Sequence, residues 1–269
     1  MNAVVNEQDC SSIAPTIDND PMLPRFYAPD LDGDRSVITL PADEARHLSR
    51  VLRLGAGDEV SVFNGRGAEF RAVVETAVRE TAVLRLSDAL PVAPAPPVQI
   101  TLVQAILKGG SMDDAIRDAT MMGAASIEPV LTAHADVKAS AVKRPGILER
   151  WNRVALASVK QSRRSTLPAI HPPRTFDEWI TAPSAGIILI FVEPSSECAP
   201  APLKQLLDHD VPARATVLIG PEGGWSPREI AQALAAGAMA VSLGPLTLRA
   251  ESMPVAALAA LNALWAAAQ

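Results

Sequence analysis

Two glycine-rich loops near the end of the chain restrict its fold more than any other feature. The first loop, 219–224 (Ile-Gly-Pro-Glu-Gly-Gly), follows the apolar run 215–219, and the second, 243–249 (Leu-Gly-Pro-Leu-Thr-Leu-Arg), follows the run 238–243. Both runs carry no charge and are too short for a helix, which predicts buried strands. Each glycine loop is therefore expected where a buried strand ends.

A helix is expected after each loop. Ser226 is a predicted N-cap, Pro227 stands at the first helical position, and Glu229 completes a capping box. After the second loop, residues 254–269 are rich in Ala and Leu, which favours a closing helix. Strands that alternate with helices are typical of a parallel α/β sheet, whose ligands bind at the carboxyl ends of the strands. We therefore expect both loops to line one pocket.

The glycines themselves admit two interpretations. Gly220, Gly223 and Gly224 have no side chain, so a flat ligand could lie against their backbone. Alternatively, they only allow tight turns, because Gly and Pro interrupt any loop. The sequence contains neither the dinucleotide-binding nor the Walker motif, so a phosphate cradle is not expected.

The loops and their flanks resemble a known family. The residues that carry the resemblance are Gly220, Pro221, Glu222, Gly223, Gly224, Ser226, Glu229, Leu243, Gly244, Leu248, Arg249 and Glu251. They are similar to the C-terminal signature of ribosomal RNA small subunit methyltransferase E, a family of the SPOUT class of methyltransferases. The similarity extends from Pro24 onward and includes the Arg-Val-Leu-Arg motif at 50–53 and Gln161, Ser162 and Arg164.

The resemblance implies an α/β fold with a SPOUT-type parallel sheet and a C-terminal trefoil knot, a rare exception to the usual rules of chain topology. It also implies a small N-terminal PUA-like β-barrel, a homodimer, and S-adenosyl-L-methionine as the cofactor. The implied activity is methylation of uridine N3 in 16S ribosomal RNA, in the decoding region of the small subunit. The implied partner is therefore the small ribosomal subunit.

The resemblance places the cofactor against the backbone of the two glycine loops. The expected cofactor-binding residues are Leu218, Ile219, Gly220, Pro221, Glu222, Gly223, Gly224, Leu243, Gly244, Leu246 and Leu248. A neutral adenosine and a zwitterionic methionine do not need a phosphate cradle, which fits the missing motifs. Glu222 would either contact the ligand or hold its own loop, and the sequence does not separate these roles.

Two charged residues of the last loop are expected to carry the chemistry. Uracil N3 bears a proton, so methyl transfer requires its removal and stabilisation of the negative charge left on the ring. Arg249 is a permanent cation next to the expected cofactor loop and suits the stabilising role. Glu251 would accept the proton or fix Arg249. Alternatively, the two residues form an ion pair that only holds the final loop.

The N-terminal part of the chain predicts a small barrel. Short β-type runs are separated by turn signals, and they lie at 37–40, 59–63, 68–75 and 81–86. Between the first two runs, residues 41–54 are expected to form a helix with Arg46, His47, Arg50 and Arg53 on one face. A lone histidine is more often a surface or core residue than a ligand. The resemblance assigns Arg50 and Arg53 to RNA contact.

One basic block stands out in a chain whose net charge is −6. Residues 138–164 hold eight Lys or Arg residues and one acid, Glu149. A helix over 147–164 would place Leu148, Trp151, Ala155 and Val159 on one face and Arg150, Arg153, Lys160 and Arg164 on the other. The basic face would neutralise RNA phosphates or would only be solvated. The resemblance favours RNA.

The composition along the chain predicts four segments. Residues 1–23 are polar and without apolar periodicity, which indicates a flexible extension. The barrel is expected at 24–90. Residues 91–97 contain four prolines and predict a stiff linker. The methyltransferase domain is expected at 98–269.

Within that domain we expect five strands. Besides the two before the glycine loops, the apolar runs are 98–107, 126–131 and 186–192. Helices are expected at 111–122, with Ser111 as its cap and acids in its first turn, and at 203–208.

The sequence gives little support for a disulfide-rich, metal-binding, secreted or membrane-spanning protein. Cys10 and Cys198 form no motif for a disulfide framework, and no metal site is expected. The N-terminus has no basic start before an apolar core, and no apolar run approaches the roughly 18 residues of a membrane span. Residues 254–268 are apolar but too short. We therefore expect a cytoplasmic enzyme that does not bind membranes.

The segment 160–164 is Lys-Gln-Ser-Arg-Arg where the family that the chain resembles usually has Glu-Gln-x-Gly-Arg, and four further residues depart from the family pattern. They are Asp118, Met121, His134 and Ala250. The departures leave the cofactor loops unchanged but lie where the family has substrate-facing polar residues. The alternative reading is therefore a divergent relative that methylates another RNA position, or that binds RNA without catalysis.

Overall fold

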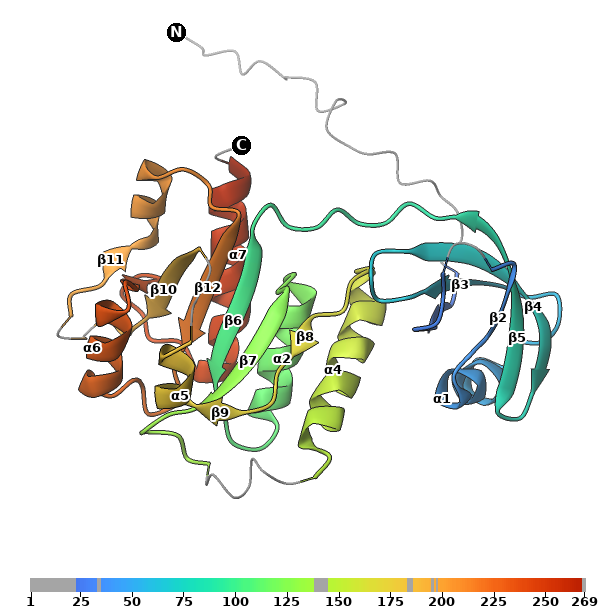
Figure 1. Ribbon diagram of the computed structural model, residues 1–269, viewed down its shortest axis with the longest axis horizontal. Coiled ribbons are helices and arrows are strands. Elements are labelled where there is room, and N and C mark those ends of the chain that lie inside the picture. The colour runs from blue at the N-terminus through green and yellow to red at the C-terminus, as the bar shows by residue number, and fades with distance from the viewer. Residues whose placement is uncertain are drawn as a thin grey trace, which may run out of the picture.

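The computed structural model describes residues 23–32, 35–137, 145–182, 186–194, 196 and 198–267. The predicted extension at 1–23 lies outside the described residues except for Leu23, and so do Lys138, Lys143 and Arg144 of the basic block. Two sheets stand side by side, connected across the top of Figure 1 by an extended segment around the predicted linker 91–97. The predicted domain boundary at this linker is retained as a proposal.

The first sheet has the strand order β1-β3-β4-β5-β2. Its strands are β1 (Arg25–Tyr27), β2 (Val37–Thr39), β3 (Glu59–Phe63), β4 (Glu69–Val78) and β5 (Thr81–Ala89). β1 pairs with β3 in parallel, and the other pairs are antiparallel. Four of the strands were predicted, whereas β1 was missed because three residues are too few for a pattern. Among the described strands β1 and β2 do not pair with each other, so the predicted barrel is open there.

The helix that joins β2 to β3 differs from the prediction of one continuous helix over 41–54. Helix α1 (Ala42–Arg46) passes into a π-helix, η2 (His47–Val51), and Arg53 then has a left-handed backbone with φ of 57°. Leu48 is fully buried in the core of the first sheet. A π-helix is uncommon and often marks a functional segment. Here it contains Arg50, at the start of the Arg-Val-Leu-Arg motif.

All strand pairs of the second sheet are parallel, as predicted. The five predicted strands are present as β6 (Gln99–Ala105), β7 (Ser126–Leu131), β10 (Ile187–Phe191), β12 (Arg214–Ile219) and β13 (Met239–Ser242). The prediction of five strands in all is wrong, because three two-residue strands extend the sheet: β8 (Ala169–Ile170), β9 (Arg174–Thr175) and β11 (Ala201–Pro202). The strand order is β11-β13-β10-β12-β6-β7-β8, with β9 also on β7.

Helices cover both faces of this sheet (Figure 1). On one face, α2 (Ser111–Met121), α4 (Ile147–Ser162), α7 (Met253–Ala267) and the 3₁₀ helix η3 (Leu203–Asp208) pack on the main core. On the other, α5 (Phe176–Ile180) and α6 (Pro227–Ala235) cover a smaller core. The fold class is therefore confirmed as an α/β parallel sheet with a second, mixed N-terminal sheet, while the knot remains a prediction.

Two helix ends differ from the predictions. The N-cap of α2 is Gly110 and no side chain caps it, so Ser111 is already the first helical residue. Helix α4 ends at Ser162, because Arg163 adopts a left-handed conformation, and Arg164 therefore lies beyond the helix. The apolar face of α4 is as predicted, with Trp151, Ala155 and Val159 in the core.

The C-terminal helical segment is longer than the sequence suggested. Among the described residues one helical stretch, Ala250–Ala267, is long and apolar enough to cross a membrane by length and composition alone. The prediction that no run reaches this length is wrong, because the 3₁₀ helix η4 (Ala250–Ser252) runs directly into α7. Leu258, Leu261 and Trp265 are buried against the second sheet. A core helix satisfies the same criterion.

Candidate active site

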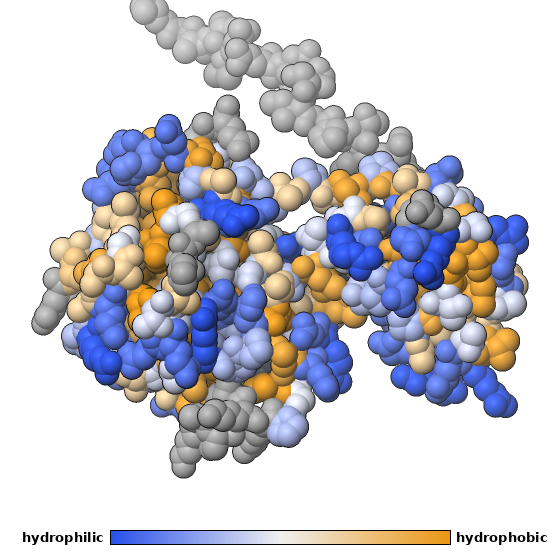
Figure 2. Space-filling view, in the orientation of Figure 1, coloured by the Kyte–Doolittle hydropathy of each residue, from blue (hydrophilic) through white to orange (hydrophobic). Residues whose placement is uncertain are grey.

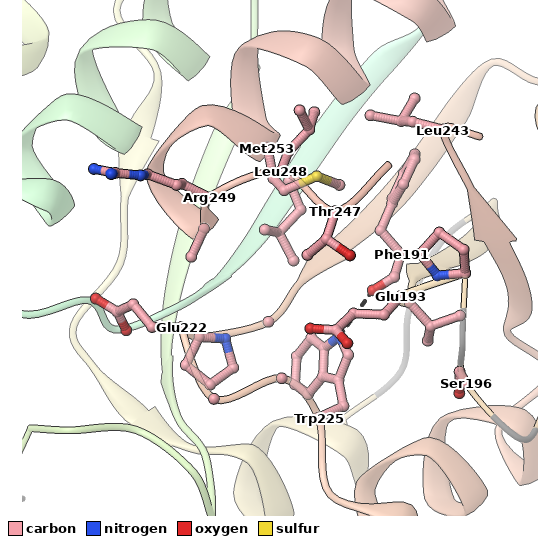
Figure 3. A pocket seen from close by; sticks show the side chains of 18 of the residues that line it. Phe191, Glu193, Ser196, Glu222, Trp225, Leu243, Thr247, Leu248, Arg249 and Met253 are labelled. Carbon is pink, nitrogen blue, oxygen red and sulfur yellow. Dashed lines mark hydrogen bonds between the residues drawn. The ribbon is translucent and has the colours of Figure 1, made fainter. Parts of the chain in front are cut away.

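A cavity of about 770 Å³ lies at the carboxyl ends of β10, β12 and β13 (Figure 3). It is lined by the two predicted glycine loops, by the loop after β10 and by the start of α2. The lining residues are Ser111, Phe191, Val192, Glu193, Pro194, Ser196, Ile219, Gly220, Pro221, Glu222, Gly223, Gly224, Trp225, Ile230, Leu243, Gly244, Leu246, Thr247, Leu248, Arg249, Ala250, Glu251 and Met253. The prediction that both loops line one pocket is confirmed.

The glycines of the first loop are required mainly by packing. A Cβ atom on Gly220 would lie 3.1 Å from Nε1 of Trp225, whose indole donates a hydrogen bond of 3.0 Å to the carbonyl of Phe191. A Cβ atom on Gly223 would lie 3.0 Å from the carbonyl oxygen of His134. At these two positions the space left by Trp225 and His134 requires glycine, whereas Gly224 has a left-handed φ of 69°, as a tight turn demands. Gly244 differs, since its φ is 126° and a Cβ atom there would meet nothing within 4 Å.

Glu229 joins the start of α6 to loop 132–134, which packs against the first glycine loop. Its Oε2 accepts hydrogen bonds from the backbone N–H and the hydroxyl of Ser226, at 2.9 and 2.8 Å, which confirms the predicted capping box. Its Oε1 accepts a hydrogen bond of 2.8 Å from the backbone N–H of Ala133. The next residue, His134, has Nδ1 3.2 Å from the carbonyl oxygen of Gly223. One buried carboxylate thus holds loop 132–134 over the first glycine loop.

Two further carboxylates border the cavity. Glu222 is at its edge, where Oε1 accepts a hydrogen bond of 3.3 Å from the backbone N–H of Lys108, which supports the loop-holding role for this residue. Glu193 follows β10 and lines the cavity, and its Oε1 would lie 3.8 Å from a Cβ atom on Gly224 (Figure 3 labels Glu193). Within the described part of the chain the Glu193 carboxylate has no hydrogen-bond partner. It is therefore available to a ligand.

Arg249 and Glu251 lie at the same edge of the cavity but are only loosely paired. Nη1 of Arg249 is 4.0 Å from Oε1 of Glu251, and their side chains are 87% and 24% exposed. In Figure 3 the Arg249 side chain extends away from the centre of the cavity. An exposed pair at this distance contributes little stability. The interpretation of the pair as a tie for the final loop is therefore not supported.

Leu218 is the one predicted cofactor residue outside the lining. Its side chain is fully buried in the smaller core, on the α5 and α6 face of the sheet. The other ten predicted residues all line the cavity. The sequence reasoning missed the loop after β10, which contributes Glu193, because that loop lacks glycines. The sequence did offer one signal for this loop, since the loop follows the most apolar of the predicted strands, 186–192.

The predicted RNA-binding residues fall into two groups. Arg50, Arg53, Arg150 and Arg153 are exposed. Nε of Arg150 donates a hydrogen bond of 2.9 Å to Asp113 on α2.

Lys160 and Arg164 do not share the exposed basic face that was predicted. Lys160 forms an ion pair with the buried carboxylate of Glu44. Arg164 donates hydrogen bonds to the carbonyl of Thr120, at 2.9 Å, and to the hydroxyl of Thr166, at 3.2 Å. Burial lowers the pKa of Arg164 to about 10. These two cations are engaged inside the protein, which corrects the prediction of a single four-residue face.

Two protein families match this chain, one over each of the two sheets. Residues 94–262 match the RNA methyltransferase domain family, and residues 40–87 match the RNA methyltransferase PUA domain family. A ribosomal RNA small subunit methyltransferase E from Synechocystis sp. is 35% identical over 232 residues, covering 85% of this chain and 74% of the relative. Another of the same name from Mycobacterium bovis is 30% identical and covers 89% of this chain and 91% of the relative.

A solved structure shows the same architecture. The ribosomal RNA small subunit methyltransferase E from Neisseria gonorrhoeae, bound to S-adenosyl methionine, superposes with a TM-score of 0.78 at 30% identity, over 90% of this chain and 98% of that one. The fold and the cavity thus define an RNA methyltransferase with an N-terminal PUA domain. Within that class, the chain belongs to the ribosomal RNA small subunit methyltransferase E family.

Proposed function

We propose that this protein transfers a methyl group from S-adenosyl-L-methionine to N3 of a uridine in 16S ribosomal RNA, in the decoding region of the small subunit. The observation that supports it most is the cavity formed by two glycine loops at the carboxyl ends of β12 and β13. A relative of the same family has been solved with this cofactor bound. The test is transfer of labelled methyl to small subunits, with the modified nucleoside identified.

The residues of the cavity fit S-adenosyl-L-methionine. Its volume of about 770 Å³ is within the usual range for small-molecule sites, which is about 300–1,000 Å³. Leu243, Leu246 and Met253 offer apolar surface to an adenine ring, and the glycine loops offer backbone groups. The carboxylate of Glu193, which has no hydrogen-bond partner among the described residues, suits the hydroxyls of a ribose or the ammonium of a methionine. When bound, the cofactor supplies an electrophilic methyl group.

Arg249 and Glu251 are suited to handle the uracil ring. Removal of the N3 proton leaves negative charge on the ring, which a permanent cation stabilises. Because Arg249 is 87% exposed and weakly held, its side chain is free to move over the cavity when a base enters. Glu251 lines the cavity beside Arg249, where it would accept the proton or orient Arg249.

The RNA is proposed to contact two exposed sets of arginines. Arg50 and Arg53 flank the exposed side chains of Val51 and Leu52 at the end of the π-helix, on the PUA domain. Arg150 and Arg153 lie on α4, on the methyltransferase domain. Arginines bind RNA phosphates electrostatically, with an affinity that falls as salt rises. A protein of net charge −6 requires such local concentration of positive charge.

We also propose a homodimer that acts in the cytoplasm. Leu246 and Leu248 precede α7, line the cavity and are 77% and 39% exposed. A second copy of the chain packed on α7 would cover them. The proposal depends on the family resemblance for its choice of partner.

The second candidate function is methylation of another RNA position, or RNA binding without catalysis, by a divergent member of the family. Two of the four departing residues have local partners: Asp118 accepts a hydrogen bond of 2.9 Å from Arg117, and His134 lies against Gly223. Identification of the methylated nucleoside decides between the two candidates.

A further inference from the structure

Arg25, at the start of the first sheet, makes contacts that the proposed chemistry does not use. Its Nε and Nη2 atoms donate hydrogen bonds of 2.9 and 2.7 Å to the two carboxylate oxygens of Glu69 on β4. Its Nη1 donates to the carbonyl of Val159 at 2.8 Å, and Nη2 also donates to the carbonyl of Arg164 at 2.8 Å. One guanidinium thus connects the PUA domain to the end of α4.

The surroundings of Arg25 make these bonds strong. The side chains of Arg25 and Glu69 are only 9% and 11% exposed. The guanidinium also lies over the ring of Phe63, 4.1 Å from the ring centre. Charged hydrogen bonds are stronger when they are shielded from water, and a cation near the last carbonyls of a helix is favoured by the helix dipole.

Three other contacts join the same two surfaces. Lys160 of α4 forms an ion pair with Glu44 of α1, whose carboxylate also accepts a hydrogen bond from the backbone of Tyr27. The backbone of residues 65–67 pairs with that of 165–167 through hydrogen bonds of 2.8 and 3.1 Å. We call these contacts, together with Arg25 and Glu69, the joint. Figures 1 and 2 show the two halves of the molecule meeting where α4 reaches the first sheet.

The joint continues toward the cavity. Arg164, whose carbonyl binds Arg25, donates its own hydrogen bond to the carbonyl of Thr120 near the end of α2. At its other end α2 begins with Ser111, which lines the cavity. The PUA domain is therefore attached to the helix that leads to the active site. The extended linker around 91–97 connects the two domains covalently, whereas the joint holds them together through non-covalent contacts.

We infer that Arg25 is a positioning residue that fixes the PUA domain relative to the cavity, so that RNA held by Arg50 and Arg53 presents its target base to the active site. The inference rests on the proposed methylation of RNA. Arg25 itself is largely buried and touches neither the cavity nor the exposed arginines. A lysine would not replace it, because a single ammonium does not present a planar fork to a carboxylate and two carbonyls at once.

The test compares paired substitutions that avoid leaving one buried charge alone. One variant carries Arg25→Met with Glu69→Met, and a second adds Lys160→Met with Glu44→Met. The control carries Arg85→Met with Glu75→Met, since Arg85 on β5 and Glu75 on β4 form a more exposed pair of 2.6 Å within the first sheet. The conservative variant Arg25→Lys is measured beside them.

Three quantities are measured on the full-length variants. They are the small-angle X-ray scattering profile, the dissociation constant for S-adenosyl-L-methionine, and kcat and KM for small ribosomal subunits. We expect the joint variants to scatter as more extended molecules and to lose at least about tenfold in kcat/KM, because misplacement of a bound substrate is costly. Cofactor affinity should stay within about twofold of that of the unaltered protein. Arg25→Lys, although it keeps a positive charge, should also lose activity on small ribosomal subunits.

Unchanged scattering together with an unchanged kcat/KM would overturn the inference, and so would an equal loss in the Arg85 control. A loss of cofactor affinity as large as the loss of kcat/KM would also overturn it, because Arg25 would then act on the cavity or on folding. If the unaltered protein transfers no methyl group, the proposed function fails, and the scattering alone decides whether the joint holds the two domains.

Discussion

Glu229 and Ala133 are 96 positions apart in the sequence, yet Glu229 Oε1 accepts a hydrogen bond of 2.8 Å from the Ala133 backbone. The same carboxylate caps α6 through Ser226. Because Ala133 precedes His134, which lies against Gly223, this bond fixes the wall of the cavity as well as a helix start. Glu229 therefore has two roles, capping α6 and holding loop 132–134, and the loss of each role can be measured separately.

Glu229→Ala should lower the free energy of unfolding by about 1–3 kcal/mol, because buried backbone donors lose their partner. It should also weaken binding of S-adenosyl-L-methionine, since loop 132–134 is released. Denaturant unfolding and calorimetry measure the two effects. Glu178→Ala is the control, because Glu178 completes a capping box on α5, away from the cavity lining. A control that weakened cofactor binding equally would contradict the account.

Much of the fold was predictable because its signals are local. Apolar runs identified the main strands, and the Ser226 to Glu229 spacing identified the start of α6 correctly. The bond to Ala133 was not predictable, because a capping box leaves one carboxylate oxygen without an assigned partner.

Lys160 and Arg164 show the limit of periodicity. Helical spacing placed them with Arg150 and Arg153, yet their partners, Glu44 and Thr120, come from other elements. The side of a helix that meets a second domain depends on tertiary contacts that one sequence does not show. The two-residue strands and the π-helix were missed for a simpler reason, since neither has a repeating pattern.

Gly223→Val should abolish cofactor binding. Its first side-chain carbon would lie 3.0 Å from the His134 carbonyl oxygen, so the first glycine loop must shift away from its place in the cavity. Isothermal titration with S-adenosyl-L-methionine measures the effect. Gly55→Val is the control, because a Cβ atom on Gly55 would meet nothing within 4 Å. Unchanged affinity in the Gly223 variant would remove this loop from the cofactor site.

Arg249→Ala should leave cofactor affinity nearly unchanged and reduce kcat by about 10²-fold or more, as expected when a group that stabilises transition-state charge is lost. Cofactor affinity should be nearly unchanged because Arg249 is exposed at the edge of the cavity. Single-turnover kinetics provide the measurement, and Arg249→Lys, which keeps a cation, should retain part of the rate. Normal turnover in the alanine variant would exclude Arg249 from the chemistry.

Glu193→Gln tests the carboxylate that lines the cavity after β10. A neutral amide of the same shape should weaken cofactor binding by about tenfold, since a hydrogen bond to a charged group contributes about 1.5–3 kcal/mol. The fold should be unaffected, because the carboxylate has no partner among the described residues. Calorimetry combined with denaturant unfolding gives both quantities. Equal cofactor affinity in the two proteins would show that Glu193 does not contact the ligand.

Reversal of Arg150 and Arg153 to Glu should weaken RNA binding and flatten its dependence on salt concentration, because fewer counterions are released. Filter binding at several salt concentrations measures the slope. The control reverses Arg214 and Arg228, which changes the net charge equally and lies off α4. If the control lost as much affinity, net charge rather than the α4 surface would explain the effect.

Arg164→Lys should make stability rise with pH. Burial lowers the pKa of the cation at this position, so a lysine here will have a folded-state pKa below its ordinary value of about 10.4. At a pH between the folded-state and the unfolded-state pKa of this lysine, the unfolded protein binds more protons than the folded protein. The free energy of unfolding therefore rises with pH in this range, because the folded protein no longer has to bury a charged lysine. Urea unfolding from about pH 7 to pH 9.5 follows the change. Arg153→Lys, at an exposed position, should leave the pH profile parallel to that of the unaltered protein.

The central claim is methylation of uridine N3 in small-subunit RNA. Small ribosomal subunits that lack the endogenous modification are incubated with this protein and methyl-labelled S-adenosyl-L-methionine, and the nucleosides are identified by mass spectrometry. The account predicts labelled 3-methyluridine that disappears with Arg249→Ala. Label in a different nucleoside, or no transfer despite measurable cofactor binding, would contradict it.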